Sequence, residues 1–204
     1  MKEEQFERKD RLVEAAVRRF SHFGVTKTTL AEVADDLALT KQALTHYFPD
    51  KQSLVAASIQ KVADEYCEEL SKEIVAAPNV GAALQLLTRV KLQFFRKHFL
   101  LLSQGSQPDW VRSEWQQNWF RSLRERELSI IENLFSKGVK TRELKPVNTS
   151  EIGGLLLDTL YAFSCCVKEQ GALPNEELFD RVLLKQRQVI NIFYQAIRFG
   201  STSN

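Results

Sequence analysis

The sequence predicts an all-α protein of about nine helices, because its apolar residues recur every three or four positions over long segments. It contains no useful length of alternating apolar and polar residues, which is the pattern that a half-buried strand needs. Its prolines fall between the periodic segments, where they break no internal helical hydrogen bond. These prolines are Pro49, Pro78, Pro108, Pro146 and Pro174.

The first helix is expected to begin at Asp10, after a highly charged N-terminal segment that we expect to be frayed. Leu12, Ala16 and Phe20 lie at helical spacing on one face of it. Together with Phe23, they would pack against the next two helices. Gly24 is expected to end this helix, because glycine readily adopts the backbone conformation that follows a helix C-terminus.

A second helix, a tight turn and a third helix are expected in the stretch TLAEVADDLALTKQALTHYF, residues 29–48. Thr29 and Glu32 have the spacing of a capping box, and Thr40 can cap the third helix. Leu30, Val33, Ala34 and Leu37 form one apolar face. Two short helices joined by such a turn are typical of the DNA-reading helix-turn-helix, although many similar pairs are only packing units.

The remaining helices are each delimited by a capping residue or a helix breaker. Asp50, Asn79, Asn148 and Asn175 are expected N-caps, and Gly138 is expected to stop the helix before it. The expected ranges are 50–77, 79–102, a short helix and a longer one ending at 137, 148–169 and 175–199. The long helix after Pro49 would connect the N-terminal head to the rest of the chain.

The helix-turn-helix segment resembles the N-terminal domain of the TetR (tetracycline repressor) family of bacterial transcription regulators, over about residues 12–57. The residues that carry the resemblance are Phe23-Gly24, Thr28-Thr29-Leu30, Val33-Ala34, Leu39-Thr40-Lys41, Leu44, His46-Tyr47-Phe48, Lys51 and Leu54. The remaining chain resembles the family only in length and helical character.

Two departures from the family pattern lie in this segment. Ala38 stands where the family often has glycine, and it fits only if the turn does not require a positive φ. Gln42 and Thr45 stand where the recognition helix often carries glycine and tyrosine. These two side chains would change which bases are read, so no known operator can be transferred.

The resemblance implies that Thr28, Thr29, Tyr47 and Lys51 hold the phosphate backbone of double-stranded operator DNA. The N-terminal ends of the second and fourth helices would add free N–H groups there. The base-reading candidates are Lys41, Gln42, Ala43, Thr45 and His46, since glutamine can pair with adenine and lysine with guanine. Thr40 completes the set of expected DNA-binding residues. Their alternative role is an ordinary polar helix face, and Leu44 and Phe48 are expected in the core.

The resemblance also implies a C-terminal domain that binds a small effector, whose chemical class stays open. The aromatic and apolar residues that could line its pocket are Phe94, Phe95, His98, Trp115, Trp119, Leu160, Phe163 and Cys166. Aromatic residues at helical spacing are also typical of plain core. A buried histidine that is satisfied by its neighbours is the alternative role of His98.

A homodimer is expected from the same resemblance, through a four-helix arrangement of the last two long helices. The residues assigned to this interface are Leu155, Leu156, Thr159, Val182, Val189, Ile190, Phe193 and Ile197. The adjacent Gly153 and Gly154 would permit a close approach of helices. The alternative is an intramolecular core, which would absorb about half of these residues.

We therefore expect two domains, a helix-turn-helix head at 1–55 and an effector-binding and dimerisation domain at 56–204. The expected function is that of a homodimeric repressor, which releases its DNA operator when a small molecule binds the C-terminal domain. An activator of the same fold is an alternative. A helical protein-binding adaptor without DNA binding is another.

Several other classes are disfavoured by composition and motifs. The sequence has no G-x-S-x-G, H-E-x-x-H, C-x-x-C or G-x-G-x-x-G, and its three histidines are scattered, so we expect no enzyme, cofactor or metal. Cys67, Cys165 and Cys166 lack a paired spacing, which favours a reducing cytoplasm. No apolar run is long enough for a membrane span. The net charge of only +2 means that any basic DNA-binding groups must be placed locally.

Overall fold

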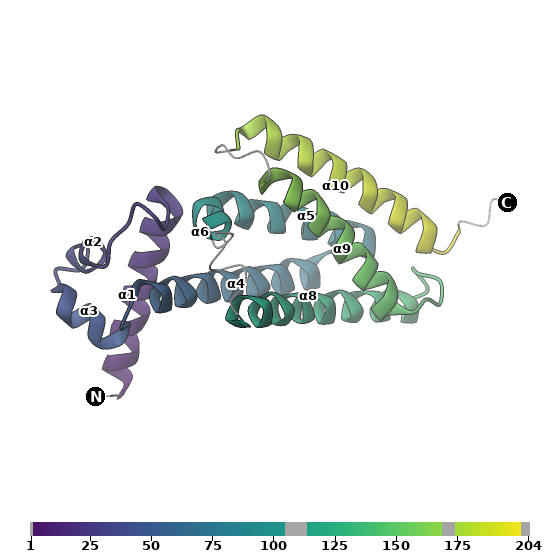
Figure 1. Ribbon diagram of the computed structural model, residues 1–204. Helices are drawn as coiled ribbons and strands as arrows, with labels where there is room; N and C mark the ends of the chain where they lie inside the picture. Colours follow the sequence, from purple (N-terminus) through teal and green to yellow (C-terminus); the bar gives the residue numbers. More distant parts are fainter. Residues whose placement is uncertain (1, 105–113, 169–173, 201–204) are drawn as a thin grey trace. The chain divides into compact units, whose positions relative to one another are not determined.

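The computed structural model describes residues 2–104, 114–168 and 174–200, and these residues form an all-α fold of nine helices (Figure 1). The predicted fold class is therefore confirmed. Within the described ranges, the only pairing of β type is an isolated antiparallel bridge between Leu144 and Arg198. None of these helices combines the length and the apolar character that crossing a membrane requires.

The chain forms two compact units. The first comprises Met1–Glu65 and Phe94–Gln116, and the second comprises Tyr66–Gln93 and Gln117–Asn204. The division falls inside a long helix, α4 (Lys51–Ala76), which contributes residues to both units. The first unit thus extends beyond the expected domain boundary at residue 55.

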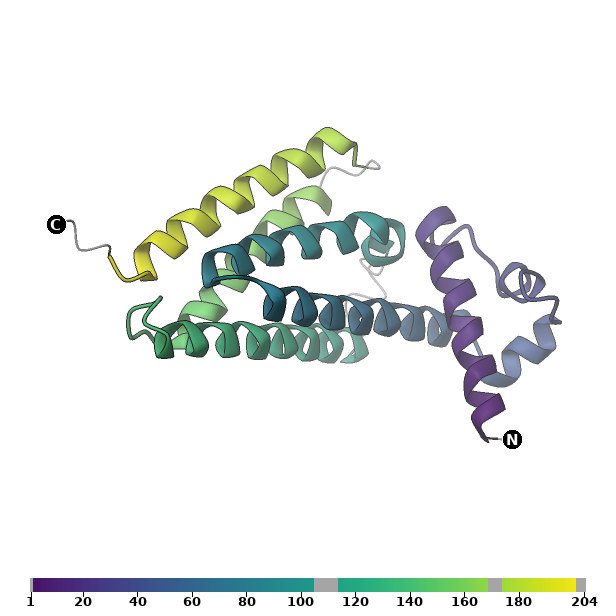
Figure 2. The ribbon, with the colours of Figure 1, turned by 180° about the vertical axis from the view of Figure 1, so that it is seen from behind.

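The first unit contains α1 (Lys2–Phe23), α2 (Leu30–Asp35), α3 (Lys41–Tyr47), the start of α4 and α6 (Phe99–Gln104). Helices α2 and α3 lie beside α1 (Figure 2). Their shared core holds fully buried apolar side chains at helical spacing. These are Leu12, Ala15, Ala16, Phe20, Val33, Ala34, Leu44 and Leu54.

Two expectations for the first helix were wrong. It begins at Lys2 rather than Asp10, because its first turns consist mostly of lysine, glutamate, glutamine and arginine, which are good helix formers. Asp10 also accepts a hydrogen bond from Lys61 of α4 at 3.0 Å, which ties these turns to the unit. Phe23 is 51% exposed instead of packing onto the helix-turn-helix, and its ring lies edge-on against His22.

The turn after α1 and the turn between α2 and α3 each contain one residue with a positive φ, a glycine in the first and an alanine in the second. Gly24 ends α1 with a φ of 85°, as its sequence position predicted. Ala38, between α2 and α3, has a φ of 54°, so this turn does require a positive φ. Its N–H and that of Leu39 donate to the carbonyls of Asp35 and Ala34, both at 3.0 Å. The family's frequent glycine here thus has a physical cause, and Ala38 bears the strain.

The second unit contains the rest of α4, most of α5 (Val80–Lys97), α8 (Glu114–Lys140) except its first residues, α9 (Thr149–Lys168) and α10 (Glu176–Ile197). Asn148 and Asn175 accept from the backbone N–H groups of Glu151 and Leu178, which confirms both as N-caps. Its core contains Leu70, Leu84, Leu87, Ile131, Phe135, Leu156 and Leu160, all fully buried.

Two helix ends in this region differ from the expectation. The helix predicted at 79–102 is divided into α5, which ends at Lys97, and α6. Helix α8 continues through Gly138 to Lys140. A Cβ at Gly138 would lie 2.7 Å from Val80 and 2.8 Å from Leu144, so this glycine permits close packing. Arg142, with a φ of 60°, supplies the left-handed residue that ends the helix.

A buried polar cluster lies inside the second unit. The Glu127 carboxylate, which is 5% exposed, accepts a hydrogen bond of 2.5 Å from the Tyr66 hydroxyl and a salt-bridging hydrogen bond from Lys91. Burial first, and then the Glu127 charge, raise the pKa of Tyr66 well above its ordinary value. Removing Lys91 alone would leave a buried carboxylate without its counter-ion, so this cluster is structurally demanding.

Candidate nucleic-acid interface

Helix α2 is held at its N-terminus by a complete capping box, as the Thr29–Glu32 spacing predicted. The Thr29 hydroxyl oxygen accepts from the Glu32 N–H at 3.3 Å, and the Glu32 carboxylate accepts from the Thr29 N–H at 2.7 Å. The hydrogen bonds that the Glu32 carboxylate accepts, first from the Thr29 N–H and then from the Thr29 hydroxyl, lower the pKa of Glu32. The start of α2 is therefore defined by its own side chains.

The C-terminal end of α2 is held by α1. The Arg19 guanidinium donates two hydrogen bonds to the Asp36 carboxylate, at 2.5 and 2.8 Å, and lies 3.8 Å from Glu32. The hydrogen bonds raise the pKa of Arg19 and lower that of Asp36. The sequence analysis did not predict this pair, because the two residues are 17 positions apart and no local pattern links them.

Helix α3 is anchored by two apolar side chains and one cap. Leu44 is fully buried and Phe48 is 4% exposed, so both belong to the core as expected. The Thr40 side chain accepts from the Ala43 N–H at 3.1 Å and starts the helix. With one side of the helix fixed in this way, its opposite side is presented to solvent.

The outward side of α3 carries most of the predicted base-reading residues. Lys41, Gln42 and His46 are exposed, while Ala43 and Thr45 are half-buried. The Thr45 hydroxyl donates to the Gln42 carbonyl at 2.9 Å, so its methyl group is the part of this side chain left for a base contact. The structure thus brings all five candidates together on one short helix.

The candidates for backbone contact lie at the ends of these helices. Thr29 is exposed, and Tyr47 and Lys51 are half-buried. Asp50 caps α4 by accepting from the Ser53 N–H at 2.7 Å, so Lys51 sits at the positive end of a long helix. Lys9 of α1 lies 5.5 Å from the centre of the Phe48 ring, which adds a cation near the same helix end.

Thr28 has a different environment. Its side chain is 1% exposed, and its hydroxyl donates to the Gly24 carbonyl at 2.9 Å. The hydroxyl therefore closes the loop between α1 and α2, and it is not presented for a phosphate. Among the expected contacts, the exposed Thr29 and the half-buried Lys51 fit the geometry better.

The expected effector residues are divided between the two units. Phe94, Phe95, His98 and Trp115 belong to the first, and Trp119, Leu160, Phe163 and Cys166 to the second. The side chain of Cys166 lies outside the described residues. Leu160 is fully buried and its carbonyl accepts from Gln186 at 3.2 Å.

His98 is 3% exposed, and its Nδ1 lies 2.7 Å from the Ser21 hydroxyl. Its Nε2 is buried, and no hydrogen-bond partner for it is found among the described residues. Burial, with a smaller effect of the Lys97 charge, lowers the pKa of His98 to about 4. The neutral ring is therefore the form that this environment accepts at pH 7.

The residues expected at a dimer interface separate into two groups. Leu156, Val182, Ile190 and Ile197 are buried within the second unit itself, as the alternative of an intramolecular core anticipated. Leu155 is 55% exposed, and Thr159, Val189 and Phe193 are half-buried. Helices α9 and α10 expose further large apolar side chains that the expectation omitted. These are Tyr161, Leu184 and Ile192.

An all-α fold with a helix-turn-helix head and an outward recognition helix defines the chain as a DNA-binding transcriptional regulator by class. Residues 12–58 match the family model described as bacterial regulatory proteins, tetR family. This stretch therefore forms the N-terminal DNA-binding domain of the TetR family of transcriptional regulators.

Solved structures of regulators share this fold over nearly the whole chain. A transcriptional regulator from Cytophaga hutchinsonii is 25% identical, with a TM-score of 0.82 over 92% of this chain and 97% of that one. A regulator from Saccharomonospora viridis in complex with choline is 14% identical, with a TM-score of 0.70 over 95% and 99%. SmeT, the repressor of the Stenotrophomonas maltophilia multidrug efflux pump SmeDEF, is 16% identical, with a TM-score of 0.64 over 95% and 91%. The last two comparisons concern the fold alone.

Proposed function

We propose that this protein is a homodimeric repressor that binds double-stranded operator DNA through α3 and releases it when a small molecule binds its C-terminal domain. The observation that carries the DNA part is the outward side of α3, where Lys41, Gln42 and His46 are exposed on a helix anchored by Leu44 and Phe48. A short polar helix held so firmly suits entry into a major groove.

The exposure and the chemistry of the side chains indicate which residues contact bases and which contact phosphates. Lys41, Gln42 and His46 read base edges, with Ala43 and the Thr45 methyl available to thymine methyl groups. Thr29, Thr40, Tyr47 and Lys51 hold phosphates on either side. The backbone contacts give affinity for any sequence, and the base contacts give preference among sequences.

The homodimer is supported by the exposed apolar side chains of α9 and α10. Leu155, Tyr161, Leu184 and Ile192 are between 46% and 70% exposed in the single chain. A large exposed apolar surface is typical of an interaction site, and a second copy would cover it. Two recognition helices in a dimer could then reach half-sites roughly 34 Å apart.

Effector binding is supported by the fold's precedent for holding a small molecule, since the Saccharomonospora viridis regulator contains choline. Helix α4 offers the route of coupling, because one continuous helix carries Lys51 at its start and core residues such as Leu70 further along. A coupling of about 1–3 kcal/mol would release DNA 5–150-fold.

The test is fluorescence anisotropy with purified protein and DNA from upstream of its own coding region, against a scrambled duplex. Specific binding that falls steeply between about 50 and 200 mM salt is expected, because phosphate contacts release counterions. Lys51→Ala should weaken binding to both duplexes. The matched control is Lys72→Ala, an exposed lysine further along α4, which should bind as the wild type does.

The alternatives give different results in the same assay. A protein-binding adaptor would show no DNA binding at either salt concentration. That result would favour a protein partner over DNA. An activator would bind specifically yet raise transcription from the bound promoter in a reconstituted assay. Equal binding of both duplexes would mean that the operator lies elsewhere or that a ligand is needed for binding.

A further inference from the structure

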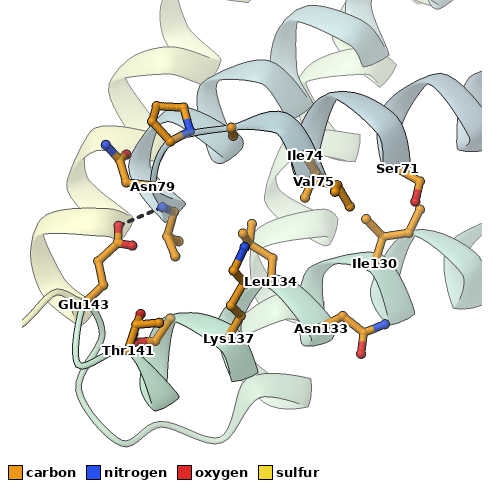
Figure 3. Close-up of a pocket in the computed structure, with 14 residues that line it drawn as sticks. Ser71, Ile74, Val75, Asn79, Ile130, Asn133, Leu134, Lys137, Thr141 and Glu143 are labelled. Carbon is orange, nitrogen blue, oxygen red and sulfur yellow. Dashed lines mark hydrogen bonds between the residues drawn. The ribbon is translucent and has the colours of Figure 1, made fainter.

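A hollow of about 540 Å³ opens in the second unit, between the end of α4, the turn into α5 and the end of α8 (Figure 3). It is lined by residues 71–80 and 130–143. None of these residues belongs to the sets proposed above for DNA, the effector or the dimer. A volume between about 300 and 1,000 Å³ is the usual size of a small-molecule pocket.

One part of the lining is apolar. Ile74 and Leu134 face each other across the hollow from α4 and α8, and Ile130 lies one turn before Leu134 (Figure 3). Val75 is 74% exposed at the rim, which is unusual for a valine. Ile74 and Leu134 are already buried, so a ligand with a short aliphatic or aromatic body would remove mainly Val75 and the half-buried Ile130 from water.

The hollow is lined by two charged side chains, Glu143 and Lys137, which differ in whether they already have partners within the protein. The Glu143 carboxylate already accepts from the Val80 N–H at 2.7 Å and from the Tyr194 hydroxyl at 3.0 Å. The Lys137 side chain rises from α8 into the hollow (Figure 3), and within the described ranges its ammonium group has no ion-pair partner. The negative group is thus occupied by the protein, and the positive group is presented to a ligand.

We propose that this hollow binds a small amphipathic carboxylate, which lays its apolar body on Ile74, Ile130 and Leu134 and pairs its anionic end with Lys137. A charge-assisted hydrogen bond at the edge of an apolar wall fixes the orientation of such a molecule. The Asn133 side-chain amide also lines the hollow and can donate a further hydrogen bond to the carboxylate, whereas the Thr141 hydroxyl already donates to the Gly138 carbonyl at 3.2 Å. This site is distinct from the proposed effector site and does not depend on it.

The test uses the full-length protein with isoleucine methyl groups labelled for NMR, titrated with sodium octanoate. The Ile74 and Ile130 signals are assigned from Ile→Val variants. Both signals should shift and saturate in the wild type. Lys137→Met, which keeps most of the length of the side chain and removes its charge, should weaken octanoate binding at these two methyl groups about tenfold.

The matched control is Lys140→Met, an exposed lysine on the same helix that does not line the hollow, and it should titrate like the wild type. Octylamine has the same body with a cationic end and should shift these signals only weakly. Equal shifts with octylamine, or equal losses in both lysine variants, would overturn the assignment of Lys137. Octanoate shifts confined to other isoleucines would overturn the site itself.

Discussion

Arg19 and Asp36 join α1 to the end of α2 through two hydrogen bonds from one guanidinium group. The same guanidinium approaches Glu32, which belongs to the capping box at the other end of α2. One residue of α1 thus contacts both ends of a helix of six residues. Such a short helix is marginal by itself, so its orientation depends on these contacts and on its buried Val33 and Ala34.

Replacing Arg19 by methionine should therefore lower the thermal midpoint of unfolding and weaken binding to every DNA sequence. Arg18→Met, at an exposed neighbouring position, is the control and should change little. Because the pKa of Asp36 lies below its ordinary 3.8, the contribution of the pair is present above that pH and is lost on further acidification. An additive double variant with Asp36→Asn would show that the two residues are not coupled.

Ala38→Gly should stabilise the protein by about 0.5–1 kcal/mol. Removing the left-handed strain at this residue should raise the free energy of unfolding by about 1–2 kcal/mol. The greater conformational freedom of glycine in the unfolded chain offsets part of that gain. Urea unfolding followed by circular dichroism measures the difference. The control is Ala43→Gly inside α3, which should destabilise by about 1 kcal/mol. A loss of stability in Ala38→Gly would contradict the positive φ of this turn.

Gly138→Ala should destabilise the protein by about 1–3 kcal/mol, because the new methyl group would overlap Val80 and Leu144. Gly154→Ala provides the comparison, since its Cβ would meet only Arg124 at 3.4 Å. Placed inside α9, that alanine should stabilise by about 0.5–1 kcal/mol through helix propensity. Similar effects of the two substitutions on the free energy of unfolding would refute a packing role for Gly138.

His98 should make stability depend on pH. Its pKa is about 4 in the folded protein and 6.5 in its ordinary state, so the unfolded chain binds the proton more readily. Stability is then complete above pH 6.5 and should fall by up to about 3 kcal/mol as the pH drops to 4. Urea unfolding across this range should lose that decline in His98→Gln and retain it in His22→Gln, an exposed histidine.

Gln42→Ala should relax base preference at one operator position and cost about 1–3 kcal/mol at that position. The measurement is anisotropy against a set of operators in which each base pair is changed in turn. When the base pair that Gln42 reads is changed, the variant should bind the changed operator almost as tightly as the original one. An unchanged ranking of the whole set would remove Gln42 from the base-reading residues.

The helix-turn-helix head was predictable because its signals are local. A capping box spans three residues, and the Thr29–Glu32 pattern specified where α2 begins. The spacing of Val33, Ala34 and Leu44 specified which side of each short helix is buried. The exposed side of α3 then followed as the complement of that buried side.

Other features needed contacts between distant residues. The sequence around Gly138 is typical of a helix C-terminus. In the structure Gly138 lies inside α8, and Val80 and Leu144 pack so close to it that a Cβ would overlap them. Likewise, nothing near Ala38 in the sequence reveals a positive φ. Both the contacts of Gly138 and the backbone conformation of Ala38 result from how the helices pack.

The sequence by itself determined the class of the fold, the position of the helix-turn-helix and the buried side of its two short helices, because helix capping and periodicity act within a few residues. Tertiary structure alone decided that Arg19 holds α2, that four expected interface residues are core, and that a hollow beside Lys137 lies between α4 and α8. These features join side chains from helices far apart in the chain, and the local pattern of neither partner encodes the distance between them.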